Sequence, residues 1–219
     1  MKKSSILTYF LSIAVLCLTG ISCNLNSSHE ADLEKTLEPV EEVTFINGTE
    51  NTTITVNKTG SSLYEIMFKG VGSNNIIADG NHEGWCLDWQ TPIESDNGTY
   101  EGIKLYSTYR VEKWKPINYF LNIRDELKEQ YPEVTWREFQ IAIWSLRANP
   151  PFDLETISVE DLPAVVKKDG QPNFSYDLVN QILAQVESGH QNFEYEEGVQ
   201  FAVIAETPVD VQTLFTVVE

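Results

Sequence analysis

The sequence predicts an α+β fold, in which a β-rich domain has helices inserted between its strands. Short runs rich in β-branched and aromatic residues occupy residues 43–89 and 199–218, and this composition is typical of strands. Residues 117–188, between these two regions, instead carry apolar residues at helical spacing. Because no repeat and no Gly/Ser-rich linker interrupts residues 43–219, we expect them to form a single domain.

Six short runs have the composition of strands, and the first three of them are bounded by glycine or asparagine. They are residues 43–46, 53–56, 64–69, 106–114, 199–205 and 211–218. The last two runs are separated by a proline, so we expect two strands at the end of the chain.

Two segments predict helices by the spacing of their apolar residues. One begins after Pro116 and ends before Pro132, because proline is tolerated only in the first turn of a helix. It carries Arg124 and Lys128 on its more polar side. The other covers residues 175–188 and ends at a glycine.

A further helix is predicted between these two, ending before a Pro-Pro pair. Thr135 and Glu138 form a capping-box pattern, in which each side chain binds a backbone N–H at the start of the helix. On this helix Gln140 shares a row with Trp136 and Trp144, at spacings of four residues. A buried amide without partners is costly, so a glutamine on an apolar row needs a specific partner.

Residues 1–22 have the pattern of a bacterial export signal. Two lysines precede an apolar run that is too short for a transmembrane helix, and the small residues before Cys23 resemble a lipobox. This resemblance implies cleavage before Cys23 and a lipid on its sulfur, which anchors the protein to the cell envelope. Asn24 stands where an inner-membrane retention signal has Asp, which favours the outer membrane or the cell surface. Residues 23–42 are polar and predict a flexible tether.

The charge and the motifs exclude several classes of function. The chain has 33 acidic and 15 basic residues, for a net charge of −18, and loss of the signal removes two lysines and no acids. Because the basic residues are scattered, we expect no nucleic-acid partner. Three dispersed histidines predict no metal site, and no dinucleotide-binding, P-loop, zinc-protease or serine-hydrolase motif is present. We therefore expect no metal and no cofactor.

The three cysteines of the sequence predict a single free thiol in the exported protein. Export removes Cys17 and lipidation occupies Cys23, which leaves Cys86. Outside the cytosol an unpaired thiol is a liability unless it is buried or used. Cys86 lies between two tryptophans in a segment of extended composition. The nearby acids Glu83 and Asp88 are expected to be solvated, and a carboxylate there would raise the thiol pKa.

The segments around Cys86 and Gln140 resemble the thioester domains of bacterial surface adhesins. Trp85-Cys86-Leu87 matches the cysteine motif of that family and Gln140-Ile141-Ala142-Ile143-Trp144 its helix motif, so the likeness covers residues 80–152. It implies a thioester-domain-like fold and a bond between the Cys86 sulfur and the Gln140 side-chain carbonyl, in a pocket formed by Trp85 and Trp144. It also implies one covalent capture of an amine, such as a lysine on a surface partner, rather than enzymatic turnover. Phe139 departs from the Thr or Val of the family.

Two other interpretations use the same residues. In the first, the protein is a noncovalent binding or structural lipoprotein, with Cys86 as a small buried hydrophobic residue and Gln140 bonded to the backbone of a neighbouring strand. In the second, it is a cysteine hydrolase or transpeptidase, in which His82 or His190 is the base for Cys86.

Overall fold

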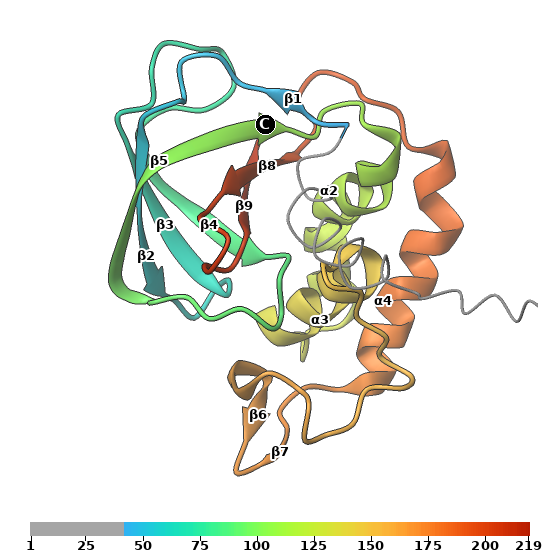
Figure 1. Cartoon of the computed structure of the whole chain (residues 1–219). Coiled ribbons are helices and arrows are strands. Elements are labelled where there is room, and N and C mark those ends of the chain that lie inside the picture. The colour runs from blue at the N-terminus through green and yellow to red at the C-terminus, as the bar shows by residue number, and fades with distance from the viewer. Residues whose placement is uncertain (1–41) are drawn as a thin grey trace, which may run out of the picture.

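The computed structural model describes residues 42–219. The predicted export signal, the predicted lipidation site Cys23 and nearly all of the predicted tether lie outside these residues. Within residues 42–219, no helix combines the length and the apolar composition that crossing a membrane requires. The described part has a β-sheet closed into a barrel on one side and α-helices on the other (Figure 1). The predicted α+β class, with helices between the strands, is confirmed.

The barrel is one antiparallel sheet with the strand order β1-β5-β2-β3-β4-β9-β8. The strands are β1 (Thr44–Phe45), β2 (Thr52–Lys58), β3 (Tyr64–Lys69), β4 (Gly80–Cys86), β5 (Asp96–Ser107), β8 (Phe201–Glu206) and β9 (Leu214–Val218). Five of the predicted runs are therefore confirmed, as β1, β2, β3, β8 and β9. Along β3, buried side chains alternate with more exposed ones, as the period of two requires for a strand with one face on the core.

Strand β5 closes the barrel because it pairs along both of its edges. It pairs with β2, and its residues 104–107 pair with β8. Register shifts in the pairing with β2 bend the strand, and Gly102 takes a φ of 70°, which glycine adopts without strain. The predicted strand over residues 106–114 is largely wrong. Arg110 is left-handed, with a φ of 60°, and Glu112–Trp114 form a 3₁₀ helix, η1.

The three predicted helices are confirmed, each to within two residues at its ends. They are α2 (Lys115–Gln130), α3 (Trp136–Arg147) and α4 (Tyr176–Gly189). Both halves of the capping box on α3 are present, because Thr135 accepts the Arg137 N–H and Glu138 accepts the Thr135 N–H. Ser175 caps α4 by accepting the Leu178 N–H. These local hydrogen bonds fix where α3 and α4 begin.

The helices pack as a layer against the barrel (Figure 1). Helix α2 contacts β8, α3 contacts β4, and α4 packs against α2 and α3. The smaller elements are η2 (Ala164–Val166), β6 (Lys167–Lys168), β7 (Gln171–Pro172) and η3 (His190–Asn192), and the β6–β7 hairpin projects away from the barrel in Figure 1. The contact between α3 and β4 joins the two segments that the sequence singled out.

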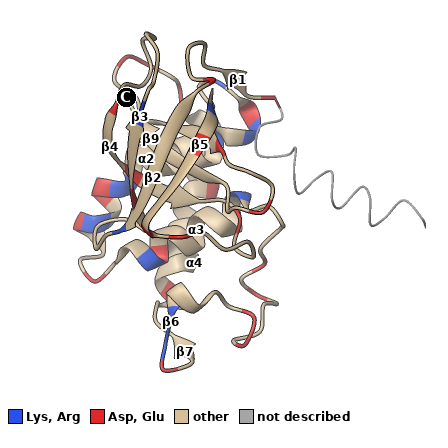
Figure 2. Cartoon of the chain, turned by 60° about the vertical axis from the view of Figure 1, so that its left-hand side comes forward, with Lys and Arg blue, Asp and Glu red and all other residues tan. Residues whose placement is uncertain are grey.

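Negative charge dominates the surface. Figure 2 shows Asp and Glu residues on helices, strands and loops of the described part of the chain, with Lys and Arg residues scattered among them. Some pairs are in contact, such as Lys128 with Asp125 at 3.1 Å, but both side chains are more than half exposed. An exposed pair of this kind stabilises a protein by about 1 kcal/mol at most. The excess of acids therefore affects the choice of partners more than the stability of the fold.

Candidate functional site

Cys86 is the last residue of β4 and is fully buried. Its backbone pairs with Leu214 of β9. Because side chains alternate along a strand, Cys86 lies on the same face of β4 as Gly84, which pairs with Tyr64 of β3. A Cβ atom at Gly84 would come within 2.6 Å of the Ile66 side chain. Glycine at this position therefore allows β3 to pack closely beside the strand that ends in Cys86.

Gln140 reaches Cys86 from α3, and both residues are 0% exposed. The Gln140 Oε1 atom accepts the backbone N–H of Cys86 at 3.1 Å, and Gln140 Nε2 donates to the Cys86 carbonyl at 2.8 Å. The side-chain amide thus pairs with the backbone of Cys86 at both ends, as a neighbouring strand would. This pairing supplies the partner that a glutamine on an apolar row requires, and it holds the Gln140 carbonyl carbon beside the cysteine.

The surroundings of the thiol keep it protonated. Burial is the largest effect and raises the pKa of the Cys86 thiol well above its ordinary value. Trp144, one turn after Gln140, lowers the pKa through its interaction with the sulfur, although its indole N–H does not reach hydrogen-bond geometry. Asp88 raises the pKa again, in the direction expected for a nearby carboxylate. Cys86 therefore differs from the preformed thiolate of a cysteine hydrolase.

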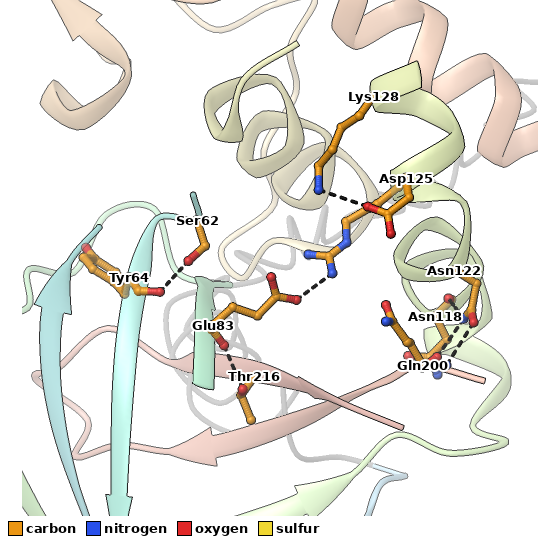
Figure 3. Close-up of polar contacts among 10 residues, drawn as sticks. Ser62, Tyr64, Glu83, Asn118, Asn122, Asp125, Lys128, Gln200 and Thr216 are labelled. Carbon is orange, nitrogen blue, oxygen red and sulfur yellow. Dashed lines mark hydrogen bonds and ion pairs between the residues drawn. The ribbon is translucent and has the colours of Figure 1, made fainter. Parts of the chain in front are cut away.

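The opposite face of β4 is tied to α2 by an ion pair. Glu83 Oε1 lies 2.6 Å from Arg124 Nη2, and Thr216 of β9 donates to the Glu83 carbonyl at 2.7 Å (Figure 3). The Arg124 guanidinium is also 5.7 Å from the centroid of the Trp85 ring. Trp85 therefore contacts α2, whereas Trp144 contacts the Cys86 sulfur. Two expectations were wrong. Arg124 was expected on the polar side of its helix but is only 9% exposed. Glu83 was expected to be a solvated loop acid but is the partner of Arg124, because a buried guanidinium needs an opposite charge.

The chain after β4 is held from two sides. The Leu87 N–H donates to the carbonyl of Thr213 at 3.0 Å, and the Leu87 carbonyl accepts the Asn149 N–H at 3.2 Å. The Trp89 indole N–H donates to the Pro150 carbonyl at 2.8 Å. The segment next to Cys86 is thereby fixed both to the loop before β9 and to the loop after α3. These hydrogen bonds hold the end of β4 close to the end of α3.

Asp88 is buried, contrary to the expectation of a solvated acid. Its carboxylate accepts the backbone N–H groups of Gln90 and Thr91 at 2.8 and 2.9 Å, which replace the lost water. Gln212 donates to the Asp88 carbonyl and accepts the Tyr64 hydroxyl. Burial, followed by the nearby Cys86, raises the pKa of Tyr64. No local sequence signal identified Gln212 or Tyr64, because only the pairing of β3, β4 and β9 brings them to this segment.

A cavity of about 190 Å³ lies next to the site. Leu87, Trp144 and Phe152 are among its walls, together with the last turn of α3 and the residues that follow it. The Phe152 ring is 5.6 Å from the Trp144 ring and 5.4 Å from the Trp89 ring, between centroids. A row of three aromatic rings therefore runs from Trp144 past the cavity.

The histidines of the described residues have partners other than Cys86. His82 Nε2 lies 3.3 Å from the carbonyl of Ala78, and His190 Nδ1 lies 2.8 Å from the carbonyl of Val186. Among residues 42–219, no three His, Cys, Asp or Glu side chains are grouped as a metal site. The described structure thus pairs Cys86 with Gln140 and Trp144, and places both predicted bases elsewhere.

Comparison with known proteins gives two weak structural similarities. No protein-family model and no curated protein matches the sequence. The N-terminal thioester domain of the fibronectin-binding protein SfbI from Streptococcus pyogenes is 9% identical, with a TM-score of 0.47, over 78% of this chain and 94% of that chain. The N-terminal thioester domain of a surface protein from Clostridium perfringens is 11% identical, with a TM-score of 0.40, over 75% of this chain and 97% of that chain.

Proposed function

We propose that this protein is a lipid-anchored surface protein in which Cys86 and Gln140 form an intramolecular thioester that captures amines on a surface partner, as an adhesin would. The observation that carries this proposal is the pairing of the Gln140 carboxamide with the Cys86 backbone, at 3.1 and 2.8 Å. The reacting groups belong to two residues that are already held together. Bond formation therefore needs little loss of conformational freedom.

The bond would form in a step whose atoms balance. The Cys86 sulfur adds to the side-chain carbonyl carbon of Gln140, the C–N bond breaks, and ammonia leaves with the proton of the thiol. The Cys86 N–H already donates to Gln140 Oε1, so it would stabilise the negative charge that develops on this oxygen. One thiol and one amide become one thioester, without a metal or a cofactor.

The same surroundings would preserve the thioester until an amine arrives. Both residues are fully buried, so water has little access to the electrophile. Because burial raises the pKa of the thiol, the thiolate is a poor leaving group, which slows hydrolysis. When an amine attacks, its nitrogen bonds to the Gln140 carbonyl carbon, the C–S bond breaks, and the sulfur takes the proton that the amine loses. Trp144, which lowers the thiol pKa, would stabilise the departing sulfur.

The partner is proposed to be an amine-bearing surface protein, with lysine as the reacting residue. The net charge of −18 attracts cationic surfaces and repels anionic ones. The lipid on Cys23 would hold the protein at the cell envelope, on the outer membrane or the cell surface. Labelling with radioactive palmitate tests this anchor, and we expect the label in the wild-type protein but not in Cys23→Ala.

Intact-mass spectrometry tests the bond directly. The purified wild-type protein should weigh one ammonia less than the mass expected for its mature, lipidated chain, and methylamine should then add to Gln140 and expose Cys86 to alkylation. Cys86→Ala and Gln140→Ala should each have the full mass of their sequences. His82→Ala is the matched control and should keep the deficit, whereas a hydrolase with His82 as base would lose its turnover. A fresh wild-type sample at full mass, with Cys86 alkylated before methylamine is added, would refute the thioester.

A second candidate is supported by one feature of the same site. The amide of Gln140 is already paired with backbone groups, and Cys86 is a buried free cysteine. These are the contacts expected for a noncovalent binding or structural lipoprotein. The two candidates differ in the mass experiment, since the noncovalent protein has the full mass and does not react with methylamine.

A further inference from the structure

The cavity beside Trp144 has the position expected of an entry site. It extends from the exposed Pro151 to the buried side chains of Leu87 and Trp144, each 1% exposed. Leu87 follows Cys86 in the chain, and Trp144 interacts with the Cys86 thiol. The Trp144 side chain therefore borders the cavity and interacts with the Cys86 thiol.

The mouth of the cavity combines the end of a helix with one cationic side chain. It lies at the C-terminal end of α3, where Ser145 and Leu146 of the last turn and the C-cap residue Ala148 line it. The last carbonyl groups of a helix lack helical partners and carry partial negative charge, so they stabilise cations. Arg147 is the one charged residue that lines the cavity, and its guanidinium, 5.1 Å from the Trp114 ring centroid, offsets this partial negative charge. The mouth therefore has no net preference for an ammonium group.

The inner part of the cavity favours an uncharged amine. Its walls there are the apolar side chains of Leu87, Trp144 and Phe152. Burial among apolar groups lowers the pKa of an amine, and only the neutral amine has the lone pair that attacks a thioester. An amine would therefore lose its proton to the solvent and enter the inner part in its neutral form, toward Gln140.

The size of the cavity limits which amines fit. An engineered cavity of about 150 Å³ admits benzene, so the 190 Å³ found here admits a lysine side chain, which is a four-carbon stem with one nitrogen. We propose that this cavity is the entry site for an unbranched primary amine of lysine length, which passes Trp144 to reach Gln140. This inference rests on the proposed thioester and assigns the route by which the amine reaches that same site.

A cavity-filling substitution with a matched control tests this inference. Ser145→Leu places a larger side chain in the cavity and removes only a hydrogen bond to the Ile141 carbonyl of the same helix. Ser188→Leu makes the same change on α4, where the hydroxyl also binds a carbonyl of its own helix, that of Gln185. Capture of butylamine, as a mimic of the lysine side chain, and of methylamine would be followed by intact mass.

The expected result separates entry from bond formation. Both variants should keep the ammonia deficit, and Ser188→Leu should react like the wild type. Ser145→Leu should capture butylamine about tenfold more slowly, with a smaller effect on methylamine, because pockets discriminate by roughly this factor per misfitting group. Equal butylamine rates for Ser145→Leu and Ser188→Leu would overturn the entry site while leaving the thioester intact.

A second variant protects the test against a folding defect in the first. Ala148→Leu narrows the cavity from outside the helix, with Ala164→Leu at an exposed position as its control. It should slow butylamine as Ser145→Leu does, and an unchanged rate would count against the entry site. A wild-type protein without the ammonia deficit would instead refute the proposed function, and the entry site with it.

Discussion

Replacing Gln140 with glutamate should make the stability of the protein depend strongly on pH. The comparison is made in a Cys86→Ala background, so that neither protein can form a thioester. A protonated carboxyl group can accept the N–H of residue 86 and donate to its carbonyl, and so reproduce both bonds of the amide. An ionised carboxylate cannot donate, and it would be buried at a position that is 0% exposed. Folding therefore favours the protonated form and raises the pKa of the glutamate.

The size and the sign of the effect follow from this shift. An unfolded glutamate ionises near pH 4.3, whereas the buried one stays protonated to a higher pH, roughly 8 to 9 in documented cases. Below about pH 4.3 both states are protonated, and the variant has its full stability. As the pH rises, only the unfolded state loses the proton, and the variant loses about 1.4 kcal/mol per pH unit. Between pH 4 and pH 7.5 the loss should approach about 4 kcal/mol.

Urea unfolding at pH 4, 5.5 and 7.5 measures this loss against the Cys86→Ala parent. Gln181→Glu, at an exposed position of α4, is the matched control and should differ little from the parent across this range, because an exposed carboxylate keeps its solvation. A difference between Gln140→Glu and the parent that changes by less than about 1 kcal/mol over the same range would refute the reasoning. It would mean that the side chain at position 140 is hydrated in the folded protein.

Two further predictions concern stability. The side chain of Asn118 is fully buried and makes four hydrogen bonds, to Thr108, Tyr195 and the Ala202 N–H. Asn118→Ala should therefore lower the free energy of unfolding by about 3 kcal/mol, and a loss below about 1 kcal/mol in urea would contradict these contacts. Because burial raises the pKa of the Cys86 thiol, Gln140→Ala, which keeps this thiol free, should have its full stability below the ordinary thiol pKa of about 8.5 and lose up to about 1.4 kcal/mol per pH unit above it, relative to the double variant Cys86→Ala/Gln140→Ala. Parallel pH profiles of the two proteins in urea would exclude a buried thiol.

The boundaries of the helices and most strands could be predicted because their causes are local. The capping box of Thr135 and Glu138 acts within one turn of helix, and proline ends a helix through its own ring and missing N–H. The segment after Ser107 was mispredicted because its local composition points to a strand that the chain does not form. Its apolar residues have strand-like composition, but the left-handed Arg110 turns the chain, and the buried Trp114 belongs to a 3₁₀ helix.

The chemistry of the site was also predictable in part. A single remaining thiol and a glutamine on an apolar helix row are both unusual by residue type alone, so Cys86 and Gln140 could be chosen as candidates without a structure. The sequence could not show which atoms of the two residues meet. The roles of the two tryptophans were likewise open, and alternation along β4 directs Trp85 toward Arg124, away from the sulfur.

By itself, the sequence determined the local elements, the acidic surface and the two residues that define the site. Only the tertiary structure decided that β5 closes the barrel through β8, that Arg124 and Asp88 are buried, and that Gln212 joins the cysteine segment. Each of these features depends on residues that are far apart in the chain, 124 positions for the bond between Gln212 and Asp88. The energy of such a contact exists only after strand pairing has set the register, because a shift of one residue turns every side chain of a strand to the opposite face.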